Sequence, residues 1–239
     1  MTQRSTHQFW IALQPIAHLG TGDVVAHEAL LRDGRGFHTD SATALFREAA
    51  REGQQGALEQ TALDLALRRV NDLPMGQKLF VNVGEPAGPT LPAAADPARV
   101  VLEVSEGHNI VDNPRIIAQA RAWREAGYAI ALDDYGVGHM GLGALLVLKP
   151  QIVKLDRLLI RGLDHDPARQ AILRSVQRLA QDMDLTVIAE GIETTEELAY
   201  LRTIGVHYGQ GFLLGRPEKH PRTQISLVRT VPKSEKRSV

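Results

Sequence analysis

Seven polar residues of this 239-residue chain fall where short hydrophobic segments, predicted as β-strands, come to an end. In an alternating strand-and-helix barrel, the carboxyl ends of the strands meet on one face, and the residues there are usually catalytic. A single acid at such a position is more often a helix cap or a solvated charge, so the interpretation as one site depends on their joint occurrence. The seven are Glu28, Asn82, Glu103, Asp133, Asp134, Lys154 and Glu190.

The types of these side chains predict a metal site. Carboxylate and amide oxygens suit hard divalent ions such as Mg²⁺ or Mn²⁺ better than they suit zinc. Asp133 and Asp134 are adjacent, and at a strand end that turns into a glycine-rich loop both can reach one cluster, with one of them bridging two ions. Among carboxylates the charged form of Lys154 is favoured, which suits a group that orients a water better than a free-amine base.

Two reaction classes fit these residues. Two ions that activate a water and stabilise the entering and leaving oxygens are a standard arrangement for phosphodiester cleavage. Metal-assisted proton abstraction next to a carboxylate uses similar residues in barrels, with a lysine or histidine as the base. The spacing of the seven residues does not separate the two classes.

Eight β-type segments, most of them separated by amphipathic helical stretches, predict an eight-stranded α/β barrel. Only about six residues, His18 to Asp23, separate the first two segments, whereas a parallel crossover needs a dozen or more. The first strand should therefore run antiparallel. The segments are Phe9–Gln14, Val24–Leu30, Lys78–Val83, Val100–Val104, Ala129–Asp133, Ile152–Leu155, Thr186–Glu190 and Val206–Gln210.

Composition limits the partners and the setting. With a formal net charge of -1 and no long basic run before the C-terminus, the chain lacks the charge pattern of a duplex nucleic-acid binder. The absence of cysteine excludes disulfides, thiolate nucleophiles and Cys-ligated zinc. The sequence shows neither a signal peptide nor the roughly 18 consecutive apolar residues of a membrane span, which predicts a cytoplasmic protein without membrane contact.

The chain is expected to form one domain followed by a tail. Residues 1–218 should make up a single barrel domain. From about Lys219 onward the hydrophobic periodicity is lost and charged residues become frequent. Residues 219–239 are therefore predicted to be a charged C-terminal tail that is partly disordered.

Seven short motifs follow one another along the chain. The first is EALLR at residues 28–32, preceded by QPI at residues 14–16. The other six motifs are VNV at 81–83, LEVSE at 102–106, LDDYG at 132–136, VKLD at 153–156, AEGIE at 189–193 and QGF at 210–212. In this order, and over nearly the whole chain to Arg216 and Pro217, they resemble the motifs of the EAL domain family of cyclic di-GMP phosphodiesterases, which is named after the first motif and has QPI in its first strand.

The resemblance implies a modified TIM-type (β/α)8 barrel with the first strand antiparallel. It also implies hydrolysis of cyclic di-GMP to linear pGpG by a water that two metal ions activate. The expected cofactors are Mg²⁺ or Mn²⁺, and Ca²⁺ is expected to inhibit. By similarity, Glu28, Asn82, Glu103 and Asp133 would hold one ion, while Asp133, Asp134 and Glu190 would serve the other. Lys154 would position the attacking water, so the expected catalytic residues are Glu28, Asp134, Lys154 and Glu190.

The resemblance further assigns residues around the nucleotide. Arg32 is expected on a substrate phosphate, and Gln14, Leu31 and Gln210 are expected near the rest of the substrate. Glu106 and Glu193 would anchor the loop that follows Asp134. A homodimer through the helices near that loop is also a family trait.

The loop after Asp134 departs from the family pattern. Residues 133–142 read DDYGVGHMGL, where the family usually has DDFGTGYSSL, so a threonine and two serines are replaced. A second hypothesis is therefore a non-hydrolysing receptor that binds cyclic di-GMP and signals to a protein partner. Such receptors typically have lost metal ligands, and none is lost in this chain. Control is expected from a regulatory protein or from a sensor domain outside this sequence.

Overall fold

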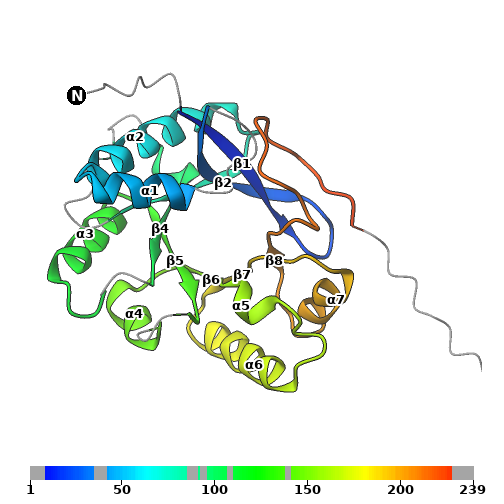
Figure 1. Ribbon diagram of the computed structural model, residues 1–239. Coiled ribbons are helices and arrows are strands. Elements are labelled where there is room, and N and C mark those ends of the chain that lie inside the picture. The colour runs from blue at the N-terminus through cyan, green and yellow to red at the C-terminus, as the bar shows by residue number, and fades with distance from the viewer. Residues whose placement is uncertain are drawn as a thin grey trace, which may run out of the picture.

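Eight strands form a closed barrel in which each strand pairs with its neighbour in the chain, and the last pairs with the first (Figure 1). The computed structural model describes residues 9–34, 42–84, 91, 96–106, 110–137 and 141–227, with the backbone alone at 42–44. The strands are β1 (Phe9–His18), β2 (Val24–Asp33), β3 (Lys78–Asn82), β4 (Val100–Ser105), β5 (Ala129–Tyr135), β6 (Ile152–Leu155), β7 (Thr186–Ala189) and β8 (Tyr208–Gly209).

Helices connect most of the strands and cover the outside of the barrel (Figure 1). Several begin at the expected caps. Thr194, for example, forms a complete capping box with Glu197. Within the described residues, none of the helices has the length and apolar character needed to cross a bilayer. The helices are α1 (Ala42–Arg51), α2 (Gln55–Arg68), α3 (Pro114–Glu125), α4 (Gly141–Leu148), α5 (Arg157–Ile160), α6 (Pro167–Asp182) and α7 (Thr195–Thr203), with 3-10 turns η2 (Arg69–Asp72) and η3 (Pro97–Arg99).

The predicted barrel and its antiparallel first strand are confirmed. Strand β1 runs antiparallel to β2, with Phe9 opposite Asp33 and Gln14 opposite Glu28, and antiparallel to β8 on its other side. All other neighbouring strands are parallel. Because β1 is reversed, its N-terminal half reaches the face where the carboxyl ends of the other strands meet.

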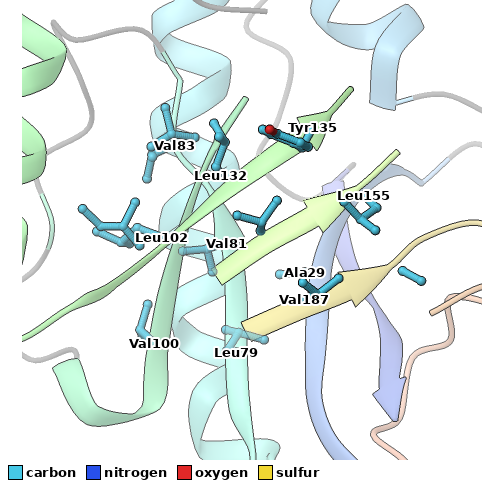
Figure 2. Close-up of a cluster of buried hydrophobic side chains, with 14 of the residues drawn as sticks. Ala29, Leu79, Val81, Val83, Val100, Leu102, Leu132, Tyr135, Leu155 and Val187 are labelled. Atoms are coloured by element: carbon cyan, nitrogen blue, oxygen red, sulfur yellow. The ribbon is translucent and has the colours of Figure 1, made fainter. Parts of the chain in front are cut away.

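Alternate residues of the strands face two separate apolar layers. The outward-facing residues, among them Leu79, Val81, Val100 and Leu102, pack against the helices in the larger core (Figure 2). The inward-facing residues form a smaller layer that fills one end of the barrel interior, made of Ile16, Ala26, Phe80, Val101, Ala131 and Ile188 with Ile152 and Tyr208 packed against it.

The inner layer explains where the polar residues lie. In a strand, residues two apart point to the same face, so the residue two positions after an inner-layer residue also points into the barrel. Glu28 follows Ala26 by two positions, and Asn82 follows Phe80 in the same way. The same step leads from the other layer residues to Glu103, Asp133, Lys154, Glu190 and Gln210, and in the reversed β1 it leads from Ile16 to Gln14. The apolar layer is therefore a floor for one polar pocket.

The C-terminal segment 218–227 packs along the outside of the β1–β2 hairpin (Figure 1). Leu13 and Glu218 exchange two backbone hydrogen bonds of 2.7 and 3.0 Å. Farther along, the Val24 N–H donates to the Thr223 carbonyl (3.0 Å), and Ile225 is buried. The expected tail thus begins with an ordered covering segment, while residues 228–239 lie outside the described residues.

This covering segment buries a histidine, from which we expect a pH-dependent stability. His27 is fully buried, its Nε2 accepts a hydrogen bond from the Arg222 backbone N–H (3.0 Å), and burial lowers its pKa from 6.5 to about 4. The unfolded chain therefore takes up a proton below about pH 6.5, whereas the folded chain does so only near pH 4. The free energy of unfolding should fall by up to about 3 kcal/mol across this window as the pH decreases.

Urea unfolding at several pH values checks this expectation. In His27→Gln, the decrease between pH 6.5 and 4 should be smaller than in the wild-type protein, because glutamine does not titrate. Equal slopes in the two proteins would contradict the assignment of a neutral His27 in the folded state.

Candidate active site

Lys154 is the centre of the polar pocket. Its side chain is 1% exposed, and its Nζ lies within ion-pair distance of four carboxylates that come from or follow four different strands. The distances from Nζ are 2.5 Å to Glu103 Oε1, 2.7 Å to Glu190 Oε1, 3.0 Å to Asp133 Oδ1 and 3.6 Å to Glu28 Oε2. These five predicted site residues are therefore brought into one cluster.

The electrostatics of this cluster keep the lysine charged. Burial alone would lower the pKa of Lys154, but the charges of Asp133 and Glu103 lead the opposing effect and raise it well above its usual value. Burial raises the pKa of Glu103 and of Glu190 well above that of an exposed glutamate, and the charge of Lys154 opposes this only in part. The pocket thus holds more carboxylates than its single ammonium can compensate.

Two amide side chains tie the carboxylates together. Asn82 Nδ2 donates to Glu103 Oε2 (3.1 Å) and to Glu28 Oε1 (3.5 Å). Gln210 Nε2 donates to Glu28 Oε2 (2.6 Å) and to Glu190 Oε1 (3.1 Å). Gln14, which lies opposite Glu28, donates instead to the Gly215 carbonyl (3.2 Å). Asn82, Gln210 and Gln14 therefore line the same pocket. The side chain of Gln14 is directed to the segment that follows β8.

A second cluster of acids overlaps the first, because the two share Asp133 and Glu190. Asp133, Asp134 and Glu190 each place a carboxylate oxygen within 4.8 Å of the others, which is a spacing that a metal ion can fill. Asp134 has a left-handed backbone (φ +57°) beside a register irregularity between β5 and β6. A non-glycine residue pays roughly 1–2 kcal/mol for that conformation. The irregular backbone lets two successive aspartates face one pocket, although successive strand residues normally point to opposite sides.

The two predicted loop anchors behave differently. Glu106 is buried, and its Oε2 accepts a hydrogen bond from the Gly136 N–H (2.9 Å), just after Asp134. Glu193 is exposed, and its backbone N–H donates to Glu197 Oε2 (2.9 Å). The described residues thus support an anchoring position for Glu106, while residues 138–140 of the loop lie outside the described residues.

The predicted substrate residues on β2 lie at the edge of the pocket. Arg32 is half-buried, and its Nη1 donates to the Leu31 carbonyl (2.9 Å). Leu31 itself belongs to the outer core, so its side chain is not among those that point into the barrel. With Asn82 and Ser105 it lines a cavity of about 290 Å³ between α2 and the strand ends.

The fold and the site define an α/β-barrel protein with an acidic, lysine-centred pocket at the carboxyl ends of its strands. The model of the EAL domain family matches residues 2–217, and the chain belongs to this family.

Several curated relatives are named as cyclic di-GMP phosphodiesterases. The Escherichia coli K12 protein "Probable cyclic di-GMP phosphodiesterase PdeB" is 30% identical over 226 residues, which covers 85% of this chain and 41% of the relative. "Cyclic di-GMP phosphodiesterase PdeB" of Shewanella oneidensis is 34% identical over 119 residues, covering 50% of this chain and 14% of the relative. The chain thus spans less than half the length of these curated relatives. At the level of the family, the names support a phosphodiesterase.

Solved structures share the fold. The calcium and cyclic di-GMP complex of Klebsiella pneumoniae BlrP1 has a TM-score of 0.81 at 30% identity, covering 94% of this chain and 60% of that chain. A manganese and cyclic di-GMP complex of BlrP1 has a TM-score of 0.77 at 31% identity, covering 88% and 56%. A standalone EAL protein from Vibrio cholerae O395, bound to cyclic di-GMP, has a TM-score of 0.74 at 26% identity, covering 90% and 95%.

Proposed function

We propose that this protein hydrolyses cyclic di-GMP to linear pGpG with the help of two divalent metal ions. The observation that carries the proposal is the pocket itself, in which Lys154 Nζ lies 2.5–3.6 Å from four carboxylates. A receptor that had lost hydrolysis would be expected to lack part of this set. Every residue of the set is present, so the receptor alternative is not favoured.

The residues of the pocket fit two divalent ions. Five carboxylates, those of Glu28, Glu103, Asp133, Asp134 and Glu190, face one ammonium, which leaves four negative charges when all are ionised. Two divalent cations would neutralise that charge, and the all-oxygen donor set suits Mg²⁺ or Mn²⁺. Within the described part of the chain, the buried Oε1 of Gln210 also lacks a hydrogen-bond partner, so the pocket has a further polar oxygen whose hydrogen-bonding capacity is unused.

The roles proposed for the residues follow from their positions. Glu28, Asn82, Glu103 and Asp133 would hold one ion, and Asp133, Asp134 and Glu190 the other. Such ions supply Lewis acidity that makes a water nucleophilic and stabilises the entering and leaving oxygens. Lys154 would orient that water through its ammonium hydrogens. Arg32, at the edge of the pocket, would bind a phosphate of the substrate, with Gln14 and Gln210 near the nucleotide.

A metal-dependence assay tests the proposal. The purified chain is incubated with cyclic di-GMP in Mg²⁺, in Mn²⁺, in Ca²⁺ and with chelator, and the products are separated by chromatography. We expect pGpG in Mg²⁺ or Mn²⁺, and little or none in Ca²⁺ or chelator. Tight binding of cyclic di-GMP in every condition without any pGpG would establish the receptor instead.

We also propose a homodimer through the surface formed by α4, α5 and α6. This surface exposes Leu142, Leu146, Leu158 and Ile172, and a groove of about 580 Å³ crosses it. Exposed apolar side chains on neighbouring helices are a feature of interaction sites.

Control of activity by a regulatory protein or a further domain is proposed as well, because the curated relatives are much longer than the matched region.

Leu146→Glu should convert the proposed dimer to a monomer. Leu146 is 69% exposed on α4, and a buried carboxylate without a partner in the interface would be strongly unfavourable. Size-exclusion chromatography with light scattering measures the change, which we expect to exceed a hundredfold in the dissociation constant. Met75→Glu is the matched control, since Met75 is 91% exposed in the turn before β3 and away from this surface. A wild-type chain that is monomeric at high concentration would contradict the dimer.

A further inference from the structure

The end of β4 and the residue after it hold the end of β5 by three hydrogen bonds, which involve Asp133, Asp134 and Gly136. The Glu106 N–H donates to the Asp133 carbonyl (2.9 Å). Ser105 Oγ donates to Asp134 Oδ2 (3.0 Å), and the Gly136 N–H donates to Glu106 Oε2 (2.9 Å). Ser105, the last residue of β4, and Glu106, which follows it, therefore fix the backbone on both sides of Asp134 and its side chain as well.

Ser105 is placed for this contact by the alternation of β4. Glu103 points into the barrel, and Ser105, two residues later, points to the same side at the upper edge of the pocket. The carboxylate of Asp134 depends on such a hydrogen-bond partner for its orientation more than the carboxylate of Asp133 does. Its backbone is left-handed (φ +57°) and the pairing of β5 is irregular there, so the ladder does not fix the direction of its carboxylate.

The hydrogen bond also distinguishes the two oxygens of Asp134. Oδ2 accepts a hydrogen bond from the Ser105 hydroxyl, and a carboxylate oxygen of Asp134 lies within 4.8 Å of ligand atoms of Asp133 and Glu190. A carboxylate held through one oxygen presents the other in a defined direction. This is the arrangement by which residues behind a metal ligand orient it.

We propose that Ser105 is a positioning residue for the second metal ion, which it serves by orienting Asp134. The inference rests on the proposed two-metal site and adds a residue that has no ligand role of its own. Removing the hydroxyl leaves every ligand in place but frees the Asp134 carboxylate to rotate. Loss of such an outer partner typically weakens metal binding 10- to 100-fold.

Calorimetric titration of the metal-free full chain with Mn²⁺ alone tests the proposal. We expect two ions in the wild-type protein. Ser105→Ala should bind one ion with wild-type affinity and the other roughly 10- to 100-fold more weakly. Ser105→Thr keeps the hydroxyl and should bind both within about threefold of wild type. Asp134→Asn is the reference that identifies which of the two sites has changed. Circular dichroism of each metal-free variant confirms that the fold is retained.

The outcomes separate this proposal from the proposed activity. Wild-type binding of both ions by Ser105→Ala, or weakened binding by Ser105→Thr equal to that of the alanine variant, would overturn the role of Ser105. Two-ion binding by a wild-type protein that leaves cyclic di-GMP intact would refute the phosphodiesterase while the test of Ser105 still stands. A wild-type protein that binds no Mn²⁺ would refute both.

Discussion

Lys154→Met should lower the turnover of cyclic di-GMP by roughly 10²- to 10⁴-fold, the range that a positioned proton-handling or electrostatic group contributes. The substitution keeps the length of the side chain but removes the ammonium that lies between Glu103, Asp133 and Glu190. In the metal-free protein it should also lower the free energy of unfolding by roughly 3–5 kcal/mol, because it leaves buried carboxylates without their cation. Initial rates and urea unfolding measure the two effects.

Mn²⁺ distinguishes the two roles of Lys154. Saturating Mn²⁺ should restore much of the stability of Lys154→Met, since the ions supply positive charge to the same carboxylates, but it should not restore turnover. Lys149→Met is the matched control, because Lys149 is an exposed lysine outside the pocket. Full activity of Lys154→Met at saturating metal would refute the role assigned to the lysine.

A chain that ends at Pro217 should be too unstable to purify as a folded protein, or should melt roughly 10–30 °C below the full chain. Truncation there removes the four backbone hydrogen bonds by which residues 218–225 pair with Leu13, Gly22 and Val24. It also removes buried Ile225 and exposes His27. These losses sum to roughly 4–9 kcal/mol, against a usual total stability of about 5–15 kcal/mol. For a chain of this length, each kcal/mol of lost stability lowers the melting temperature by about 2–4 °C, which gives the expected shift.

A chain that ends at Leu227 is the control, because it keeps each of these contacts. Thermal unfolding followed by circular dichroism compares the two truncations with the full chain. Equal melting temperatures for all three would show that segment 218–227 does not contribute to stability. The matched region of the family ends at residue 217, so this experiment also asks whether the folded unit of this chain extends beyond it.

Much of the pocket was predictable because strand alternation is a local property. Hydrophobic residues two positions before Glu28, Asn82, Glu103 and Lys154 already indicate which side chains point inward. The short connection between the first two strands likewise fixes their antiparallel pairing, because so few residues cannot form a parallel crossover.

Other features depend on contacts between distant segments. The covering role of 218–227 comes from pairing with Leu13 and Asp23, which lie far earlier in the chain, and its sequence has neither helical nor strand periodicity. Ser105 was missed because a serine at a strand end has many ordinary uses. The signal that finds it is its inward position two residues after Glu103, combined with the left-handed Asp134, which only the structure shows.

The buried lysine has a consequence for how the protein would acquire the proposed metal ions. Lys154 acts as an internal counterion, so the barrel can close around its acids before any metal arrives. Burial raises the pKa of both Glu103 and Glu190, which favours protonation of these acids when no metal is bound. Metal binding at the proposed site would compete with protons there, so we expect the apparent affinity for Mn²⁺ to increase with pH. Metal ions and protons would thus compete for the same carboxylates, while the ammonium of Lys154 stays in the pocket in both states.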